Sequence, residues 1–131
     1  MKNQKTKVLV IVEDGRKPLE AIAKTIKTTL VDKAAVKTRS ASEVAIPEIL
    51  AADAYAFGVG DSASSSWAEI KRLLTGMNLA GRKAGFFVET KGAAVGLKAA
   101  FEPAELSVAD RDLVAGGQSD TDAWILALLG V

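Results

Sequence analysis

Uninterrupted apolar runs and apolar stripes with helical spacing alternate along this chain. Residues 8–12 read Val-Leu-Val-Ile-Val with no polar residue between them, which is typical of a strand buried on both faces of a parallel sheet. The next apolar residues share the spacing of one helical face and predict a helix over residues 17–30. They are Leu19, Ile22, Ala23, Ile26 and Leu30. Pro18 fits the first turn of this helix, because the N–H that proline lacks would have no partner there.

The same alternation continues to the C-terminus. Apolar runs predict further strands over residues 34–38, 53–60, 84–88 and 106–109. Helical spacing predicts helices over residues 65–75 and 95–101, and a last helix that opens at Asp120 or Thr121. We expect residues 40–50 to form a connector with a helical turn near residues 47–50. Strands that alternate with helices favour parallel βαβ units with right-handed crossovers, so we expect a single three-layer α/β/α domain over residues 1–131.

Both tryptophans fall on apolar helical stripes. Trp67 begins the stripe of the helix at residues 65–75, and Trp124 belongs to the stripe of the last helix. We interpret both as core residues, with stacking of Trp67 on a flat ligand as the alternative.

The composition narrows the chemistry. The chain contains no Cys and no His, which excludes disulfides, thiol catalysis, cysteine-ligated metals and the commonest general base. Its net charge of +1 gives no bulk attraction to nucleic acid or to an anionic membrane, and no apolar segment approaches the length of a membrane span. We therefore expect a cytoplasmic protein that binds neither nucleic acid nor a membrane.

Three stretches resemble the flavodoxin-like family and together cover nearly the whole chain. Residues 7–12, the glycine turn after them and residues 19–23 are similar to the family's opening strand, phosphate loop and first helix. Residues 52–58 resemble the entry to its third strand, and Leu-Ala-Gly-Arg-Lys at 79–83 resembles its Leu-x-Gly-Lys-Lys lead-in to the fourth. The resemblance implies a five-stranded parallel sheet of order 2-1-3-4-5, with the ligand at the carboxyl edge between strands one and three.

The resemblance also implies an FMN cofactor and electron transfer with a redox partner protein. In that mechanism the flavin carries the electrons and the protein tunes its potential. The loop after the first strand would hold the phosphate, and the loops after the third and fourth strands would flank the ring. The implied cofactor-binding residues are Asp14, Gly15, Arg16, Lys17, Gly60, Asp61, Ser62, Ala63, Ser64, Thr90, Lys91, Gly92 and Ala93.

The first loop departs from the family's Ser/Thr-x-Thr-Gly-Asn-Thr pattern. In residues 12–17 only Gly15 matches, and every expected hydroxyl is absent. Glu13 and Asp14 instead bring negative charge to the phosphate position, where two unit charges at about 4 Å repel by roughly 4 kcal/mol. The cations at 16 and 17 can offset that repulsion or be solvated, so a ligand loop and an exposed turn of mixed charge are both open.

The other two loops present similar alternatives. Residues 58–66 carry glycines and hydroxyls that suit either a ligand pocket or a flexible loop with a helix cap. Residues 90–92 suit either contacts to a ring edge or an ordinary loop that leads into a helix. Neither loop offers an aromatic residue before Trp67 to stack on a flavin.

Two further functions therefore stand beside FMN-dependent electron transfer. The first is a domain that keeps the fold, has lost the flavin, and binds a protein or a small ligand. The second is a receiver-like phosphorylation switch, because Glu13 and Asp14 resemble the Mg²⁺-holding acidic pair of response-regulator receivers and Thr90 resembles their switch hydroxyl. The receiver's phosphoacceptor position carries no Asp here, since Asp61 lies three residues too late.

Overall fold

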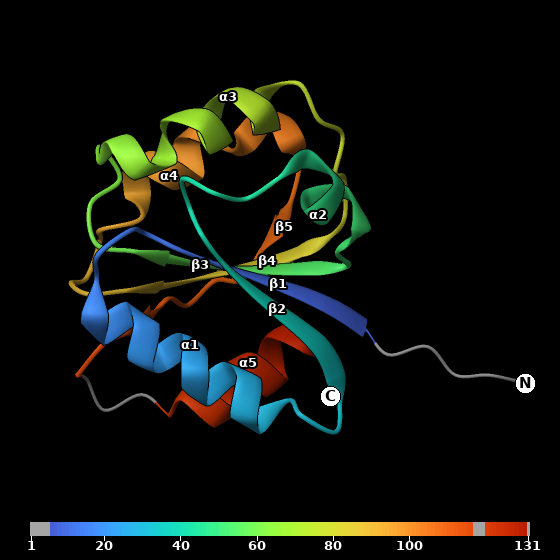
Figure 1. Ribbon diagram of the computed structural model, residues 1–131, viewed down its shortest axis with the longest axis vertical. Coiled ribbons are helices and arrows are strands. Elements are labelled where there is room, and N and C mark those ends of the chain that lie inside the picture. The colour runs from blue at the N-terminus through green and yellow to red at the C-terminus, as the bar shows by residue number, and fades with distance from the viewer. Residues whose placement is uncertain (1–5, 117–119, 131) are drawn as a thin grey trace, which may run out of the picture.

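The computed structural model describes residues 6–116 and 120–130 (Figure 1). The strands are β1 (Thr6–Val12), β2 (Ala34–Ser40), β3 (Ala54–Val59), β4 (Lys83–Val88), β5 (Ser107–Val108) and β6 (Leu113–Val114). The helices are α1 (Lys17–Thr29), α2 (Ile46–Ala51), α3 (Ala68–Thr75), α4 (Val95–Ala100) and α5 (Thr121–Leu129), with 3₁₀ turns η1 (Ser65–Trp67) and η2 (Glu102–Ala104). The helical turn expected in the connector is α2, and the helix expected from residue 65 begins as the 3₁₀ turn η1.

The strands pair in parallel in the order β2-β1-β3-β4-β5, which confirms the predicted topology. β1 lies between β2 and β3, with Val10 opposite Thr38 on one side and opposite Ala56 on the other. One feature differs from the prediction of a single fifth strand over residues 106–109. Both β5 and β6 pair with β4, because the polar run at residues 110–112 separates their apolar residues.

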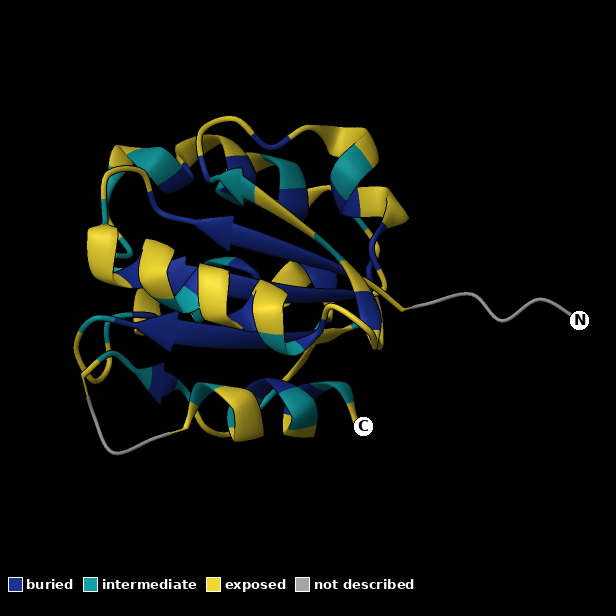
Figure 2. Cartoon of the chain, turned by 60° about the horizontal axis from the view of Figure 1, so that its bottom comes forward, coloured by how far each residue is buried: buried dark blue, intermediate teal, exposed yellow. Residues whose placement is uncertain are grey.

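Helices cover both faces of the sheet. α1 and α5 lie on one face and α2, α3 and α4 on the other (Figure 1). The apolar run of β1 divides between these layers, since alternate side chains of a strand point to opposite faces. Val8, Val10 and Val12 pack under α1, whereas Leu9 and Ile11 pack under the other layer. This division explains why β1 needs no polar residue, and Figure 2 shows the central strands buried beneath helices with exposed outer faces.

Aromatic rings fill the core under α3 and α4. Phe57 lies at the centre of this group, 5.1 Å from the ring of Phe86 and 5.0 Å from that of Phe101. The indole of Trp67 meets Phe57 edge-on at 6.3 Å and is fully buried. The interpretation of Trp67 as a core residue is therefore confirmed.

The last helix, α5, packs closely on β4. Asp120 caps its N-terminus by accepting a hydrogen bond from the Asp122 N–H at 2.9 Å. Trp124 packs against the core on the α1 side of the sheet but is only partly buried. Its Nε1–H donates to the Arg111 carbonyl at 3.0 Å. Among the described residues, no helix combines the length and apolar character needed to cross a membrane.

Candidate functional site

The loops after β1, β3 and β4 meet at the carboxyl edge of the sheet. Because these strands are parallel neighbours, their carboxyl ends lie side by side. The chain order reverses here, since β2 lies on one side of β1 and β3 on the other. This is the position where open α/β sheets most often bind ligands, and it contains the residues predicted from the sequence.

A buried carboxylate connects the first two of these loops. Glu13 follows β1 directly and is only 1% exposed. Its Oε1 accepts hydrogen bonds from the N–H groups of Gly60 at 3.0 Å and Asp61 at 2.8 Å. The same oxygen accepts one from the Trp67 indole N–H at 2.9 Å. Buried charge is tolerated where it is paired and hydrogen-bonded, and Glu13 meets both conditions.

Arg16 supplies the positive partner and reaches the third loop. Its Nε lies 2.7 Å from Glu13 Oε2, and its Nη1 lies 2.9 Å from Oε1 of Glu89 at the end of β4. The hydrogen bond and charge of Glu13, with a smaller contribution from Glu89, raise the pKa of the Arg16 guanidinium. Gly60 leaves room for this side chain, since a Cβ there would lie 2.7 Å from Arg16 Cζ. The carboxyl-edge network, as we call it, consists of the side chains of Glu13, Arg16 and Glu89 and the three N–H groups that donate to Glu13. These N–H groups belong to the backbone of Gly60 and Asp61 and to the indole of Trp67.

A second set of contacts joins the loop after β3 to the loop after β4. The Ser62 hydroxyl donates to the Ala93 carbonyl and accepts the Leu97 N–H at 3.1 Å. Gly96 permits this approach, because a Cβ there would lie 3.1 Å from Ser62 Cβ. Lys71 donates to the Ser62 carbonyl at 2.7 Å and holds the same loop from α3. The two loops expected to flank a flavin ring are thus bonded directly to each other.

The predicted residues of the first loop do not all point to one place. Asp14 turns toward the loop after β2, where its carboxylate accepts hydrogen bonds from the N–H and hydroxyl of Ser42. Gly15 adopts a positive φ of 73°, which favours glycine. Lys17 is the first residue of α1 and is exposed. Among the side chains predicted in this loop, only that of Arg16 enters the network.

The predicted residues of the other loops mostly stabilise those loops. Asp61 accepts the Ala63 N–H at 2.9 Å, and the Ser64 hydroxyl caps η1 by accepting the Ser66 N–H at 3.2 Å. Thr90 accepts the Ala93 N–H through its carbonyl at 3.1 Å, and Gly92 accepts that of Val95 at 3.2 Å. Lys91 is exposed. These contacts match the loop-and-cap interpretation of both segments.

Several residues of this site were not among those predicted. They are Glu13 as a structural anion, Glu89, Ser42 and the indole N–H of Trp67. A carboxylate immediately after a buried strand, with an arginine three residues later, was the signal for the Glu13–Arg16 pair. Nothing in the sequence pattern indicates Glu89 or Ser42, because their contacts depend on the spatial order of the strands.

The acidic pair that suggested a receiver-like Mg²⁺ site is divided between two partners. Glu13 binds the loop after β3 while Asp14 binds Ser42. Within residues 6–116 and 120–130, no cluster of three or more metal-ligating side chains is present. This arrangement does not favour the phosphorylation switch.

The side chains at this edge do not fit an FMN in the position that the resemblance implies. A phosphate at the first loop would meet the Glu13–Arg16 pair, whose guanidinium already binds two carboxylates. Pro18 removes one N–H from the first turn of α1. A ring between the second and third loops would have to displace the contacts of Ser62 with Ala93 and Leu97.

Comparison with known proteins identifies the fold. No protein-family model matches the sequence, and no curated protein matches it. A short-chain flavodoxin associated with a non-canonical PDU bacterial microcompartment superposes with a TM-score of 0.77 at 12% identity, over 95% of this chain and 97% of that one. Oxidised Flavodoxin 2 from Bacillus cereus superposes with a TM-score of 0.76 at 16% identity, over 95% and 99%.

A larger protein contains a similar unit. A flavo di-iron protein from Thermotoga maritima matches with a TM-score of 0.73 at 19% identity, over 98% of this chain but 36% of that one. At such low sequence identity, structural similarity shows a shared fold and not a shared function. The strand order, the layers and these superpositions together show that the chain has the flavodoxin-like fold.

Proposed function

We propose that this chain is a flavodoxin-fold binding module whose flavin position is taken by its own side chains. The proposal rests on the direct connection of the three loops at the carboxyl edge. Glu13 binds the loop after β3, Arg16 binds the end of β4, and Ser62 joins the loops after β3 and β4. Ligand binding then takes place elsewhere on the fold, and this edge serves as a rigid support.

The energetic cost of opening this edge supports the proposal. Removing one partner of a buried ion pair typically costs about 3–5 kcal/mol. The Arg16 side chain is 36% exposed, so solvent screens its pair with Glu13 and lowers this cost. Any free energy needed to open these contacts is subtracted from the free energy of flavin binding, and each 1.4 kcal/mol lost weakens the affinity tenfold.

FMN-dependent electron transfer is the second candidate, and two observations favour it. The fold matches solved flavodoxins over nearly their whole length. In addition, α1 begins at Lys17 directly after the loop that follows β1, and N–H groups at the start of a helix suit a phosphate. This candidate requires the Ser62 contacts to open for the ring.

The visible absorption spectrum separates the two candidates. Protein purified without added cofactor is expected to be colourless, and free FMN added to it is expected to keep its own spectrum. A yellow protein that retains flavin through gel filtration would instead establish FMN binding. A flavodoxin carried through the same purification shows that the procedure preserves bound flavin.

A variant tests whether the network itself excludes the flavin. Ser62→Gly removes the hydroxyl that joins the loops after β3 and β4. The control Ser66→Gly removes a partly buried hydroxyl in η1, at a residue whose N–H binds the Ser64 hydroxyl. We expect weak FMN binding to rise in the Ser62 variant and to stay at the wild-type level in the Ser66 variant. Circular dichroism confirms that both variants fold.

A further inference from the structure

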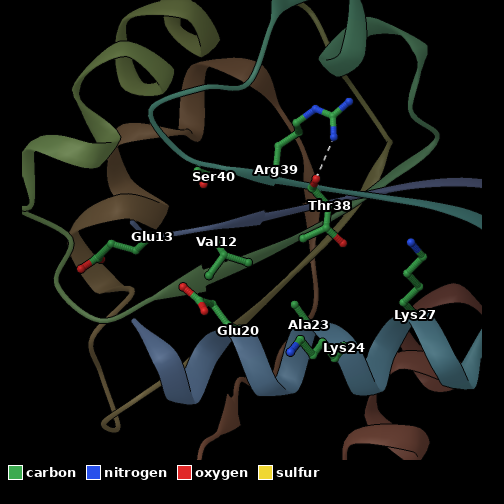
Figure 3. A pocket seen from close by; sticks show the side chains of 9 residues that line it. All are labelled: Val12, Glu13, Glu20, Ala23, Lys24, Lys27, Thr38, Arg39 and Ser40. Carbon is green, nitrogen blue, oxygen red and sulfur yellow. Dashed lines mark hydrogen bonds between the residues drawn. The ribbon is translucent and has the colours of Figure 1, made fainter. Parts of the chain in front are cut away.

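A groove runs between α1 and the edge strand β2, on the face of the sheet away from α3. Its volume, open to solvent on one side, is about 380 Å³, within the range of about 300–1,000 Å³ that is usual for small-molecule sites. Val12 and Ala23 supply apolar atoms to its lining, while the polar side chains come from α1 and β2. Figure 3 shows the two elements facing each other across this groove.

The groove carries an excess of positive charge. Lys24 and Lys27 line it from α1, and neither forms an ion pair with another residue in the described ranges. Lys27 extends from α1 toward the sheet (Figure 3). Glu20 is the one acidic side chain on the α1 side of the lining, and Glu13 turns away from the groove into the carboxyl-edge network.

The edge of β2 adds uncharged hydrogen-bond donors. The Ala41 N–H donates to the Val12 carbonyl of β1 at 2.8 Å, so alternation along the strand turns the N–H groups of Thr38 and Ser40 away from β1. The Thr38 carbonyl also points away from β1, and the Arg39 guanidinium donates to it at 3.0 Å. The side chains of Thr38 and Ser40, each with a hydroxyl, line the groove.

We infer that this groove binds an oxyanion carried by a small organic molecule, either a phosphate monoester or a carboxylate. Lys24 and Lys27 neutralise the anion, and the hydroxyl and N–H donors of Thr38 and Ser40 orient its oxygens. The apolar floor at Val12 and Ala23 receives the carbon part. The inference rests on the proposed function, since it gives the binding module a ligand class.

The occupant is a small molecule and not an added β-strand from a partner protein. Strand addition needs the outward carbonyls of the edge strand, and Arg39 covers that of Thr38. A basic side chain placed on an edge in this way is a common device against strand pairing. An anion needs N–H groups and lysines, and the Arg39 contact occupies a carbonyl and not an N–H.

Amide chemical shifts of the full chain test the site. Phenyl phosphate, benzoate and inorganic phosphate are titrated at constant ionic strength, with benzyl alcohol as the uncharged control and hexaglutamate as the acidic peptide. We expect saturable shifts at Thr38 and Ser40 with phenyl phosphate or benzoate, and none with benzyl alcohol. Shifts that appear with hexaglutamate alone, or no saturable shift with any small anion, would overturn the inference.

Matched lysine variants locate the binding. Lys24→Ala/Lys27→Ala is expected to weaken anion binding roughly tenfold or more, since charge-assisted contacts are lost. Lys33→Ala/Lys91→Ala removes the same charge at exposed sites outside the groove and is expected to keep the wild-type affinity. Equal weakening by both pairs would mean that the anion senses net charge only, which contradicts a built site.

The same spectra keep this inference separate from the proposed function. FMN is itself a phosphate monoester, so it is added to an identical sample. Shifts confined to Thr38 and Ser40 would place its phosphate in the groove. Saturable shifts at Gly60 and Gly92 would instead place the flavin at the carboxyl edge, which would refute the proposed function but leave the groove to be judged by phenyl phosphate.

Discussion

At the scale of single residues, Glu13 has the largest predicted effect on stability. Its removal leaves Nε of Arg16 and the N–H groups of Gly60, Asp61 and Trp67 without their acceptor, while Nη1 of Arg16 keeps Glu89. We expect Glu13→Ala to lower the free energy of unfolding in urea by about 3 kcal/mol. The control Glu69→Ala breaks an exposed, solvent-screened ion pair with Arg72, so we expect a much smaller loss of stability.

The same variant distinguishes the loss of an internal anion from a general loss of packing. Glu13→Ala leaves converging donors around a space that fits a small carboxylate, so formate should bind the folded variant and raise its melting temperature. The wild type, whose donors are engaged, should show no such gain at equal ionic strength. An identical response of both proteins to formate and to chloride would contradict the role of Glu13 as an internal anion.

Gly85 shows how the close approach of α5 restricts one position of β4. A Cβ there would lie 2.8 Å from Trp124 Cζ2 and 2.9 Å from Leu128 Cδ2. We expect Gly85→Ala to destabilise the fold by about 1–3 kcal/mol, because α5 must shift. Gly76→Ala is the control, since nothing but the Leu73 carbonyl lies within 4 Å of its Cβ, at 3.9 Å. Thermal unfolding of the two variants measures the difference.

At the scale of elements, Glu48 attaches α2 to β2 in a way that depends on pH. The hydrogen bond from the Ala45 N–H, followed by that from Arg39 and the charge of Lys37, lowers the pKa of Glu48. A carboxyl with a lowered pKa in the folded state stabilises the fold above the pKa of the unfolded state, and this contribution is lost as pH falls through the folded value. We expect Glu48→Gln to be less stable than the wild type at neutral pH.

The pH profile of that difference is the measurement. The gap between wild type and Glu48→Gln in urea unfolding should be constant above the ordinary glutamate range. It should shrink as the pH falls below that range toward the lowered pKa of Glu48. A gap that does not change with pH would assign the effect to altered packing of α2.

The element scale also shows where sequence patterns were sufficient. The uninterrupted apolar run of β1 predicted a strand buried on both faces. The apolar stripe of α1 predicted a helix buried on one face, because the two kinds of burial give different patterns of apolar residues. The fifth strand was predicted as one piece. Periodicity along the chain does not indicate that residues 110–112 leave the sheet and that Leu113 then pairs with β4 again. The fold was therefore predictable from local patterns and their order along the chain.

At the scale of the whole molecule, the sequence predicted where the candidate site lies but not which side chains form it. The parallel order put the three loops at one edge, as expected for this topology. Which side chains fill that edge depended on contacts across strands, such as Arg16 with Glu89 and Ser62 with Ala93. Those pairs lie far apart in sequence, and single-chain periodicity carries no information about them.

We propose that this protein keeps the flavodoxin-like fold while its own side chains occupy the position of the flavin. A fluorescence titration of FMN with the purified wild-type protein distinguishes this from flavin binding. We expect FMN fluorescence to stay unquenched up to high micromolar protein. Saturable quenching at low micromolar protein, accompanied by amide shifts at Gly60 and Gly92, would contradict it and establish the chain as a flavin carrier.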